Sequence, residues 1–235
     1  MESNVFSPVR HRYALAFKEI DDNNPQILDV GGYVSRAALV MDHFESFDYK
    51  SINVGTAWYN NEQCDYLYDG VTIPFDDQTF DFTISVDCIE HLPSEGREKF
   101  VNEMIRVSKK AAIIVSPFRR LDHETEERYV LDVCARFGIK APPSLVEHEL
   151  YGLPTYEELQ EFVNKNSGML KFATVKRDYW SLQMAMLWNT IALRGNSDQV
   201  NRKLQTFQEE LLSNQNVHLD VNNAYRCVLV FRRKP

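Results

Sequence analysis

The chain has 235 residues, of which 44% are hydrophobic, so it can bury the core of one domain and is not a disordered chain. Its net charge of −8 argues against nucleic acid as a partner, because an acidic surface repels phosphate backbones. Only 9 residues are glycine, which excludes collagen-like chains and glycine-rich linkers.

Signals for export, disulfides and membrane insertion are missing from the pattern. The four cysteines include no Cys-x-x-Cys pair, and the first residues lack the basic and apolar regions of a signal peptide. No apolar stretch approaches the roughly 18 residues of a membrane span. We therefore expect free thiols, no membrane span and a cytoplasmic location.

Apolar runs alternate with amphipathic segments through the first half of the chain. A helix is expected to begin at Pro8, and a buried strand at residues 26–30 stops at Gly31-Gly32. Lys109-Lys110 is expected to end a helix that Ser94 caps. The other elements expected here are that helix at 94–105, a helix at 37–44, and strands at 51–54, 80–86 and 111–115. Strands and helices that alternate in this way indicate a parallel sheet wound by helices.

The second half is richer in helical patterns. A helix is expected at 126–137, ended by Gly138, and Thr155 with Glu158 forms a capping box at the start of another. The remaining elements expected here are a strand at 170–175, a buried apolar segment at 181–193, an amphipathic helix at 200–211 and a final strand at 227–231. We expect one domain over 1–235, with a core at 1–120, a helical cover at 121–220 and a last strand at 221–235.

The turn after the first strand is a candidate ligand site. A glycine turn between a strand and a helix allows a ligand to approach the backbone and the free N–H groups of the helix. A dinucleotide site would need glycine at positions 33 and 36, where Tyr33 and Arg36 stand, and an acidic residue near Asn53. An NAD-dependent enzyme is therefore disfavoured, and a plain strand-to-helix turn is the alternative.

A longer run carries a more specific signal. The chain has an acidic residue before an Ile-Pro-Phe run, then an acidic turn, a strand and a Glu-His-x-Pro run. These features are Asp69, Ile73-Pro74-Phe75, Asp76-Asp77, Phe80-Asp81 and Glu90-His91-Leu92-Pro93, followed by Arg106-Val107 and Pro117. The run resembles class I S-adenosylmethionine-dependent methyltransferases. A later segment, Glu147-His148 to Gly152-Leu153-Pro154, is similar to bacterial members found beside or fused to glycosyltransferases.

The resemblance implies an α/β fold with a Rossmann-like, doubly wound, mostly parallel sheet and helical additions in the C-terminal half. It also implies S-adenosylmethionine as the cofactor. By position, Asp69 and Gly70 would flank the adenine, Asn53 would face the ribose and Asp87 would lie under the sulfonium. The residues at the amino-acid end of the cofactor would be Asp29, Gly31 and Gly32.

Acceptor-side residues follow from the same comparison. His91 and Glu90 follow the strand at 80–86, where a histidine can deprotonate an acceptor hydroxyl. The alternative is that His91 caps a turn while Glu90 pairs with an arginine. His148, Tyr151 and Arg119 are candidates to face the acceptor, or to be merely solvated or packed. No metal site is expected, because the acidic residues around His123 are typical of helix caps.

Two functions from different classes fit these observations. The first is methyl transfer from S-adenosylmethionine to a small-molecule or glycan-type acceptor, at oxygen, in a protein that could form a homo-oligomer. The second is a non-catalytic binding or scaffold protein that kept the fold and lost the cofactor turn. Tyr33, Ser35 and Asn53 motivate the second reading, because the family has glycine or an acidic residue at these positions.

Overall fold

A computed structural model of the protein describes residues 8–41, 43–55, 62–119, 126–136, 138, 140–174, 216–218, 224 and 226–233. The expected elements at 181–193 and 200–211 lie outside these residues. Among the described segments, every helix is too short or too polar to traverse a lipid bilayer.

One sheet of eight strands organises the molecule, in the order β3-β2-β1-β4-β5-β8-β6-β7. The strands from β3 to β5 are parallel, and β8, β6 and β7 join antiparallel. The bounds are β1 Gln26–Val30, β2 Asp48–Asn53, β3 Tyr66–Leu67, β4 Phe80–Val86, β5 Ser108–Pro117, β6 Met169–Thr174, β7 Asn216–His218 and β8 Arg226–Arg232. The predicted Rossmann-like α/β fold is confirmed.

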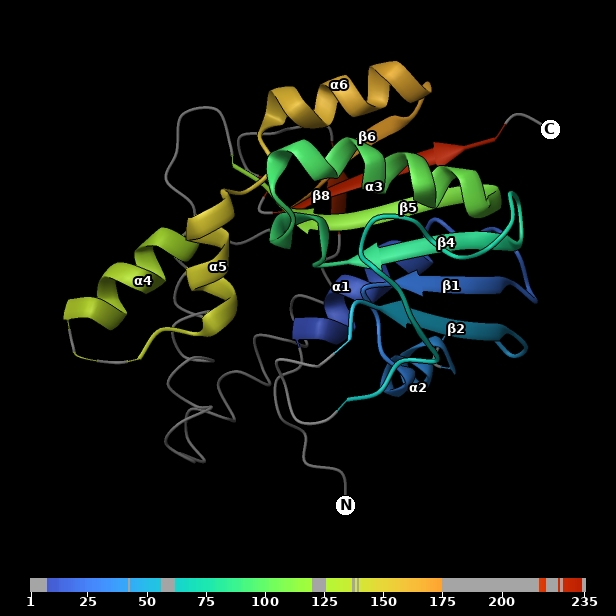
Figure 1. The fold of residues 1–235 in the computed structure, drawn as a ribbon, viewed down its shortest axis with the longest axis horizontal. Coiled ribbons are helices and arrows are strands. Elements are labelled where there is room, and N and C mark those ends of the chain that lie inside the picture. The colour runs from blue at the N-terminus through green and yellow to red at the C-terminus, as the bar shows by residue number, and fades with distance from the viewer. Residues whose placement is uncertain are drawn as a thin grey trace.

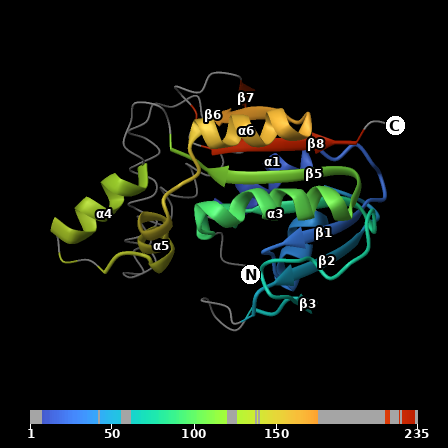
Figure 2. The ribbon, with the colours of Figure 1, turned by 45° about the horizontal axis from the view of Figure 1, so that its top comes forward.

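Helices cover both faces of this sheet, as Figures 1 and 2 show. The α-helices are α1 Pro8–Phe17, α2 Ala37–Met41, α3 Ser94–Val107, α4 Glu126–Arg136, α5 Pro143–Tyr151 and α6 Tyr156–Asn166, with short 3-10 turns η1 Val34–Arg36 and η2 Ile89–His91. One core packs α3 and α6 on the sheet through residues such as Phe100 and Leu159. The second core packs α1 and α2 on the opposite face through Leu15 and Val40. Because both faces are covered, residues 111–117 of β5 are all buried, and residues 111–115 form an apolar run.

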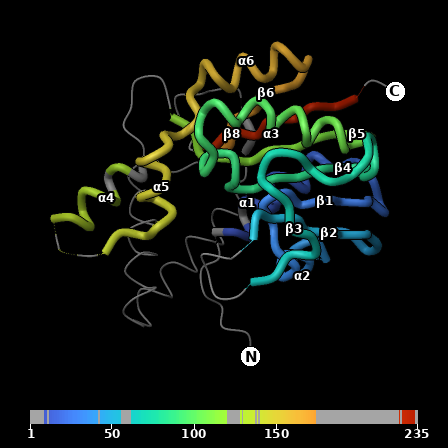
Figure 3. The backbone as a smooth tube through the Cα atoms, in the orientation of Figure 1, coloured from blue at the N-terminus to red at the C-terminus, as the bar shows by residue number. Residues whose placement is uncertain are grey.

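The carboxyl ends of the parallel strands meet at one edge of the sheet, where α5 lies (Figures 1 and 3). The chain leaves β1 toward β2 and β3 on one side, and continues to β4 and β5 on the other. This reversal between β1 and β4 is a topological switch point, which is where ligands bind in open α/β sheets. All the strand-end candidates from the sequence therefore converge on one region.

Several element boundaries differ from the expectation. Ser94 is the first residue of α3 rather than its cap, and its hydroxyl lies 3.3 Å from Glu95 instead of capping a backbone N–H. Lys109 and Lys110 belong to β5, because α3 already ends at Val107. Lys110, near the start of β5, forms an ion pair with Asp22, which lies between α1 and β1. The expected helix at 37–44 is only the short α2.

The sequence patterns missed three elements, namely β3, β7 and α5. β3 and β7 are too short to show an alternating pattern. α5 begins with Pro143, and its apolar residues follow no clear helical stripe, because the helix packs on η2 through His148 and on α4 through Leu145. Within the region expected as a helical cover, β6 pairs with β8 in the main sheet.

Candidate active site

The packing around the turn after β1 leaves no room for a side chain at Gly31 or Gly32. Gly31 has a φ of +86°, and a Cβ atom there would lie 2.6 Å from Cys88 Sγ, across the switch point. A Cβ atom on Gly32 would lie 2.1 Å from Asp29 Oδ2. The backbone N–H of Gly31 donates to Ile52 O at 2.8 Å, which ties the turn to β2. These two positions therefore accept only glycine.

Asp29 is a fully buried carboxylate directly beneath this turn. Its Oδ2 accepts hydrogen bonds from the hydroxyls of Tyr13, at 2.5 Å, and Tyr49, at 2.6 Å. Its Oδ1 is buried and has no hydrogen-bond partner among the described residues. Burial raises the pKa of Asp29 to about 6, although the two tyrosine hydrogen bonds act in the opposite direction.

Asn53, at the end of β2, holds the turn in place. Its Nδ2 donates to Gly31 O at 3.0 Å, and its Oδ1 accepts from the backbone N–H of Val54 at 2.8 Å. The half-buried Tyr33 lies beside it: burial raises the pKa of Tyr33, the nearby Glu62 adds to this effect, and a hydrogen bond with Asn53 opposes it. The Tyr33 side chain therefore lies next to Asn53, directly after the glycine turn.

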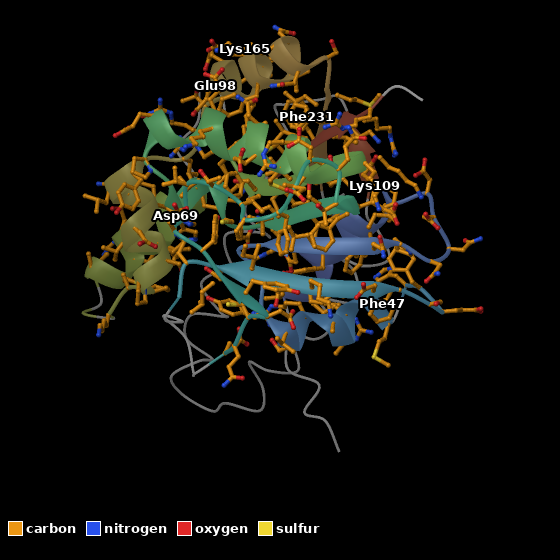
Figure 4. The ribbon with its side chains drawn as sticks, turned by 45° about the vertical axis from the view of Figure 1, so that its right-hand side comes forward. Phe47, Asp69, Glu98, Lys109, Lys165 and Phe231 are labelled. Carbon is orange, nitrogen blue, oxygen red and sulfur yellow. The ribbon has the colours of Figure 1, made fainter. Side chains whose placement is uncertain are left out.

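Asp69 and Gly70 follow β3 at the same edge of the sheet. Asp69 is exposed (Figure 4), and its Oδ1 accepts the backbone N–H groups of Val71 and Thr72 at 2.8 and 2.9 Å. These bonds hold the pKa of Asp69 below its usual range. Gly70 has a φ of +79°, and a Cβ atom there would meet Val54 at 2.9 Å. The pair forms a tight polar turn beside Asn53.

Asp87 directly follows β4, has a φ of +52° and lies between two arginines. Arg12 of α1 pairs with one carboxylate oxygen, and Arg226 of β8 pairs with the other. Burial opposes ionisation, but the two guanidinium groups lower the pKa of Asp87 below its ordinary value. The resemblance suggested a carboxylate beneath a sulfonium, whereas in the structure both oxygens already contact guanidinium groups.

Glu90, His91 and His148 form a cluster where η2 meets α5. His91 Nε2 lies 3.3 Å from His148 Nε2, which in turn is 4.0 Å from Glu90 Oε1. On its other side, His91 Nδ1 is 2.7 Å from Glu147 Oε2. Glu90 is fully buried and accepts a hydrogen bond from Ser116 Oγ on Oε2 at 3.0 Å. Among the described residues, the partners of Glu90 are therefore Ser116 and His148, and no ion pair joins it to an arginine there.

The surroundings shift the pKa values of this cluster. Burial, reinforced by the charge of Asp87, raises the pKa of Glu90 to about 8. Burial and then the neighbouring His148 lower the pKa of His91, although Glu147 opposes the shift. Perturbed groups that converge from separate elements are typical of functional sites.

Residues 28–116 match a family described as "Methyltransferase domain". The chain contains a methyltransferase domain. This domain holds nine of the residues predicted for the site, which are Asp29, Gly31, Gly32, Asn53, Asp69, Gly70, Asp87, Glu90 and His91. The other candidates follow it in the chain.

Two curated relatives match a short part of the chain. Norajmaline and ajmaline N-methyltransferases from Rauvolfia serpentina are 45% and 43% identical to this chain over 47 residues. The matches cover 20% of this chain and only 15% and 16% of those proteins.

Solved structures share the fold of the methyltransferase domain. Phosphoethanolamine N-methyltransferase 2 of Haemonchus contortus, solved with S-adenosyl-L-methionine, has a TM-score of 0.57 at 12% identity and covers 98% of this chain and 53% of that one. Geranyl diphosphate C-methyltransferase of Streptomyces coelicolor A3(2), solved with Mg²⁺ and S-adenosyl-L-homocysteine, has a TM-score of 0.55 at 7% identity. The match covers 96% of this chain and 75% of the chain of that enzyme. At these identities the likeness is one of fold.

The three candidates that follow the methyltransferase domain, His148, Tyr151 and Arg119, differ in their burial and contacts. His148 is buried within the cluster, whereas Tyr151 is 38% exposed and contributes its carbonyl oxygen to Arg97. Arg119 is exposed, and its backbone N–H donates to Pro154 O at 2.9 Å. The structure thus brings His148 to Glu90 and His91 and shows no contact of the Tyr151 or Arg119 side chain with them.

Sequence patterns missed five residues of the site. Tyr13 and Arg12 come from α1, Tyr49 and Arg226 come from β2 and β8, and Glu147 precedes His148 in α5. Of these five, only Glu147 stands in a sequence motif, because it begins the Glu147-His148 segment that resembles bacterial members of the family. The others reach the site by tertiary packing, which local patterns do not encode.

Proposed function

We propose that this protein transfers a methyl group from S-adenosylmethionine to a small-molecule acceptor. The methyltransferase-domain match over residues 28–116 carries the proposal, because it spans the whole carboxyl edge from Asp29 to His91. The cofactor would supply an electrophilic methyl group on a cationic sulfur. Positioning of the acceptor in line with it is the main contribution expected of the protein.

The residues beneath the glycine turn fit the amino-acid end of that cofactor. Asp29 Oδ1 is a buried carboxylate oxygen without a hydrogen-bond partner in the described part of the chain. An unsatisfied buried acceptor is costly, and an ammonium group is the donor that suits a carboxylate. Gly31 and Gly32 keep the backbone above Asp29 free of side chains. We assign these residues to the amino-acid end, and Asn53, Asp69 and Gly70 to the adenosine.

The acceptor is expected on the side of η2 and α5. Glu147 holds His91 Nδ1 and so turns Nε2 toward the interior of the cluster, where a hydroxyl proton could be taken up. A net charge of −8 favours a small neutral or cationic acceptor over a nucleic acid. Replacement of His91 by Gln is expected to lower kcat by about 10²- to 10⁴-fold in a screen with labelled methyl donor.

Calorimetry with S-adenosylmethionine and S-adenosylhomocysteine tests the cofactor. Asp69→Asn removes a carboxylate at the predicted adenosine end and is expected to weaken binding about tenfold, the size of a charge-assisted hydrogen bond. Asp76→Asn is the control, because Asp76 is also exposed but precedes β4 at the opposite edge. Absence of binding of both ligands at millimolar concentration would contradict the proposal and favour the non-catalytic alternative, to which Tyr33 beside Asn53 points.

A further inference from the structure

Three side-chain atoms of the η2–α5 cluster converge on one point. Glu90 Oε1, His91 and His148 each offer one ligand atom, and these atoms lie within 4.8 Å of one another. The two imidazole Nε2 atoms are 3.3 Å apart, and His148 Nε2 is 4.0 Å from Glu90 Oε1. Ligands held at about 2.1 Å around a tetrahedral ion are about 3.4 Å from each other. The two imidazole nitrogens already have this separation, and the carboxylate oxygen would have to move inward by about an ångström to complete the arrangement.

Glu90 supplies an independent reason to expect a cation. Its side chain is fully buried, and Ser116 Oγ hydrogen-bonds only Oε2. Oε1 has no hydrogen-bond partner among the described residues, and it faces His148 across 4.0 Å. A buried carboxylate oxygen without a donor is unfavourable, and a metal ion is one of the few groups that satisfies it.

Glu147 prepares His91 as a ligand. His91 Nδ1 lies 2.7 Å from Glu147 Oε2, so Nδ1 carries the proton in this contact and the lone pair of Nε2 points toward His148. A carboxylate behind a ligating histidine is the usual outer-shell partner at metal sites, where it fixes the tautomer and the ring orientation. A single hydrogen bond between the two rings would leave Glu90 Oε1 without a donor, whereas an ion satisfies all three atoms.

We propose that Glu90, His91 and His148 bind a divalent first-row transition-metal ion. Two imidazole nitrogens and one carboxylate oxygen suit Zn²⁺ and its neighbours, whereas Mg²⁺ and Ca²⁺ prefer oxygen ligands. Three protein ligands leave a coordination position open, as in catalytic rather than structural sites.

This proposal goes beyond methyl transfer, and metal binding can be tested without S-adenosylmethionine. With a metal bound, the Nε2 lone pair of His91 would be on the ion, so the ion rather than the imidazole would activate the acceptor, and the loss of kcat in His91→Gln would follow from loss of the ion. An acceptor oxygen at the open position would then lose its proton more easily, because a divalent ion lowers the pKa of a coordinated hydroxyl or water. Glu147 is the positioning residue of this site.

Titration of the chelator-treated full chain with Zn²⁺, after removal of any affinity tag, tests the site by calorimetry. One equivalent is expected to bind. Glu147→Gln should weaken binding by about 10- to 100-fold, the usual effect of an outer-shell partner, and Glu90→Gln or His148→Gln should weaken it more. His43→Gln is the control, because His43 is exposed and packs on Phe17 at the other face of the sheet. That variant should bind Zn²⁺ like the parent chain.

Co²⁺ provides a second readout that does not depend on activity. Its visible absorption should show a nitrogen- and oxygen-ligated ion, and this band should disappear in His91→Gln. Metal should also raise the Tm of the parent chain and leave that of Glu90→Gln unchanged. Affinity that survives Glu90→Gln and His148→Gln, a thiolate-to-cobalt band from a cysteine, or no binding at millimolar Zn²⁺ would overturn the proposal. Retained cofactor binding with no metal binding would overturn the metal site alone.

Discussion

Asp29 shows how one residue constrains the turn above it. Its carboxylate occupies the space into which a side chain at position 32 would project, and two tyrosine hydroxyls hold it there. Glycine is scarce in the chain, so the pair Gly31-Gly32 is conspicuous in the sequence. The structure explains both positions by close contacts with Asp29 and Cys88. Glycine at these positions is therefore a packing requirement as well as a feature of a ligand site.

Gly32→Ala is expected to lower the free energy of unfolding by about 1–3 kcal/mol, because the new methyl group would overlap the Asp29 carboxylate. Gly96→Ala in α3 is the matched control, because a Cβ atom there meets nothing within 4 Å. That control should leave stability unchanged or raise it by up to about 1 kcal/mol. Urea denaturation measures both, and equal stabilities of the two variants would contradict the packing explanation.

Asp29 should also impose a pH dependence on folding. Its pKa is raised from 3.8 to about 6, so the folded state holds the proton more tightly than the unfolded chain. The resulting stabilisation is present below about pH 4 and is lost as pH rises through about 6, with a maximum of about 3 kcal/mol.

In Asp29→Asn this contribution should be missing. The difference in unfolding free energy between the parent chain and the variant, measured from pH 4 to 7, should therefore change in favour of the variant as pH rises. A constant difference across this range would show that the Asp29 pKa is not raised.

At the scale of elements, Arg97 connects three segments around the proposed acceptor side. It lies in α3 and is 2% exposed. Its guanidinium donates to Leu92 O at 3.1 Å, to Glu158 at 3.0 Å and to the carbonyl oxygen of Gly152. Glu158 at the same time completes the capping box of α6 with Thr155. One arginine thus fixes the ends of α5 and α6 relative to α3.

Arg97→Met is expected to destabilise the protein by about 3–5 kcal/mol, because it leaves Glu158 and buried carbonyl groups without their donor. Glu98→Gln is the control on the same helix. Glu98 pairs with Lys165 of α6 on the surface, as Figure 4 shows, at 3.0 Å and with both side chains nearly half exposed. Its loss should cost less than about 1 kcal/mol. Chemical denaturation that gave the same small effect for both variants would argue against this role of Arg97.

At the scale of the whole molecule, Asp87 joins parts that are distant in the sequence. Arg12 comes from the first described helix, Arg226 comes from the last strand, and β4 lies at the centre of the sheet. β8 reaches this position because it runs antiparallel between β5 and β6, which brings its first residue to the carboxyl edge. The ion pairs therefore close the fold around the site.

Asp87→Asn is expected to lower the free energy of unfolding by about 3 kcal/mol or more, because two guanidinium groups would be left beside each other without a carboxylate. Arg12→Met in the same chain should recover part of this loss by removing one of the two charges. A double-mutant cycle of Asp87 with Arg12 measures the coupling, and a coupling near zero would contradict a structural role for the pair.

Local patterns were sufficient for the frame of the molecule. Buried strands such as β1, β4 and β5, the amphipathic α3, and the capping box of Thr155 were predicted because each depends on residues adjacent in the chain. The predicted strand ends then placed Asp29, Asn53 and Asp87 on one edge, because parallel strands share the direction of their carboxyl ends.

The partners of those residues were decided only by tertiary structure. Arg226 of β8, Tyr49 of β2 and His148 of α5 reach the site through strand order and helix packing, which the spacing of residues does not specify. The sequence by itself determined a doubly wound α/β chain with polar residues at the ends of its strands. Packing decided that Asp87 is paired with two arginines and that Glu90, His91 and His148 converge, because contacts between distant segments depend on the folded chain as a whole.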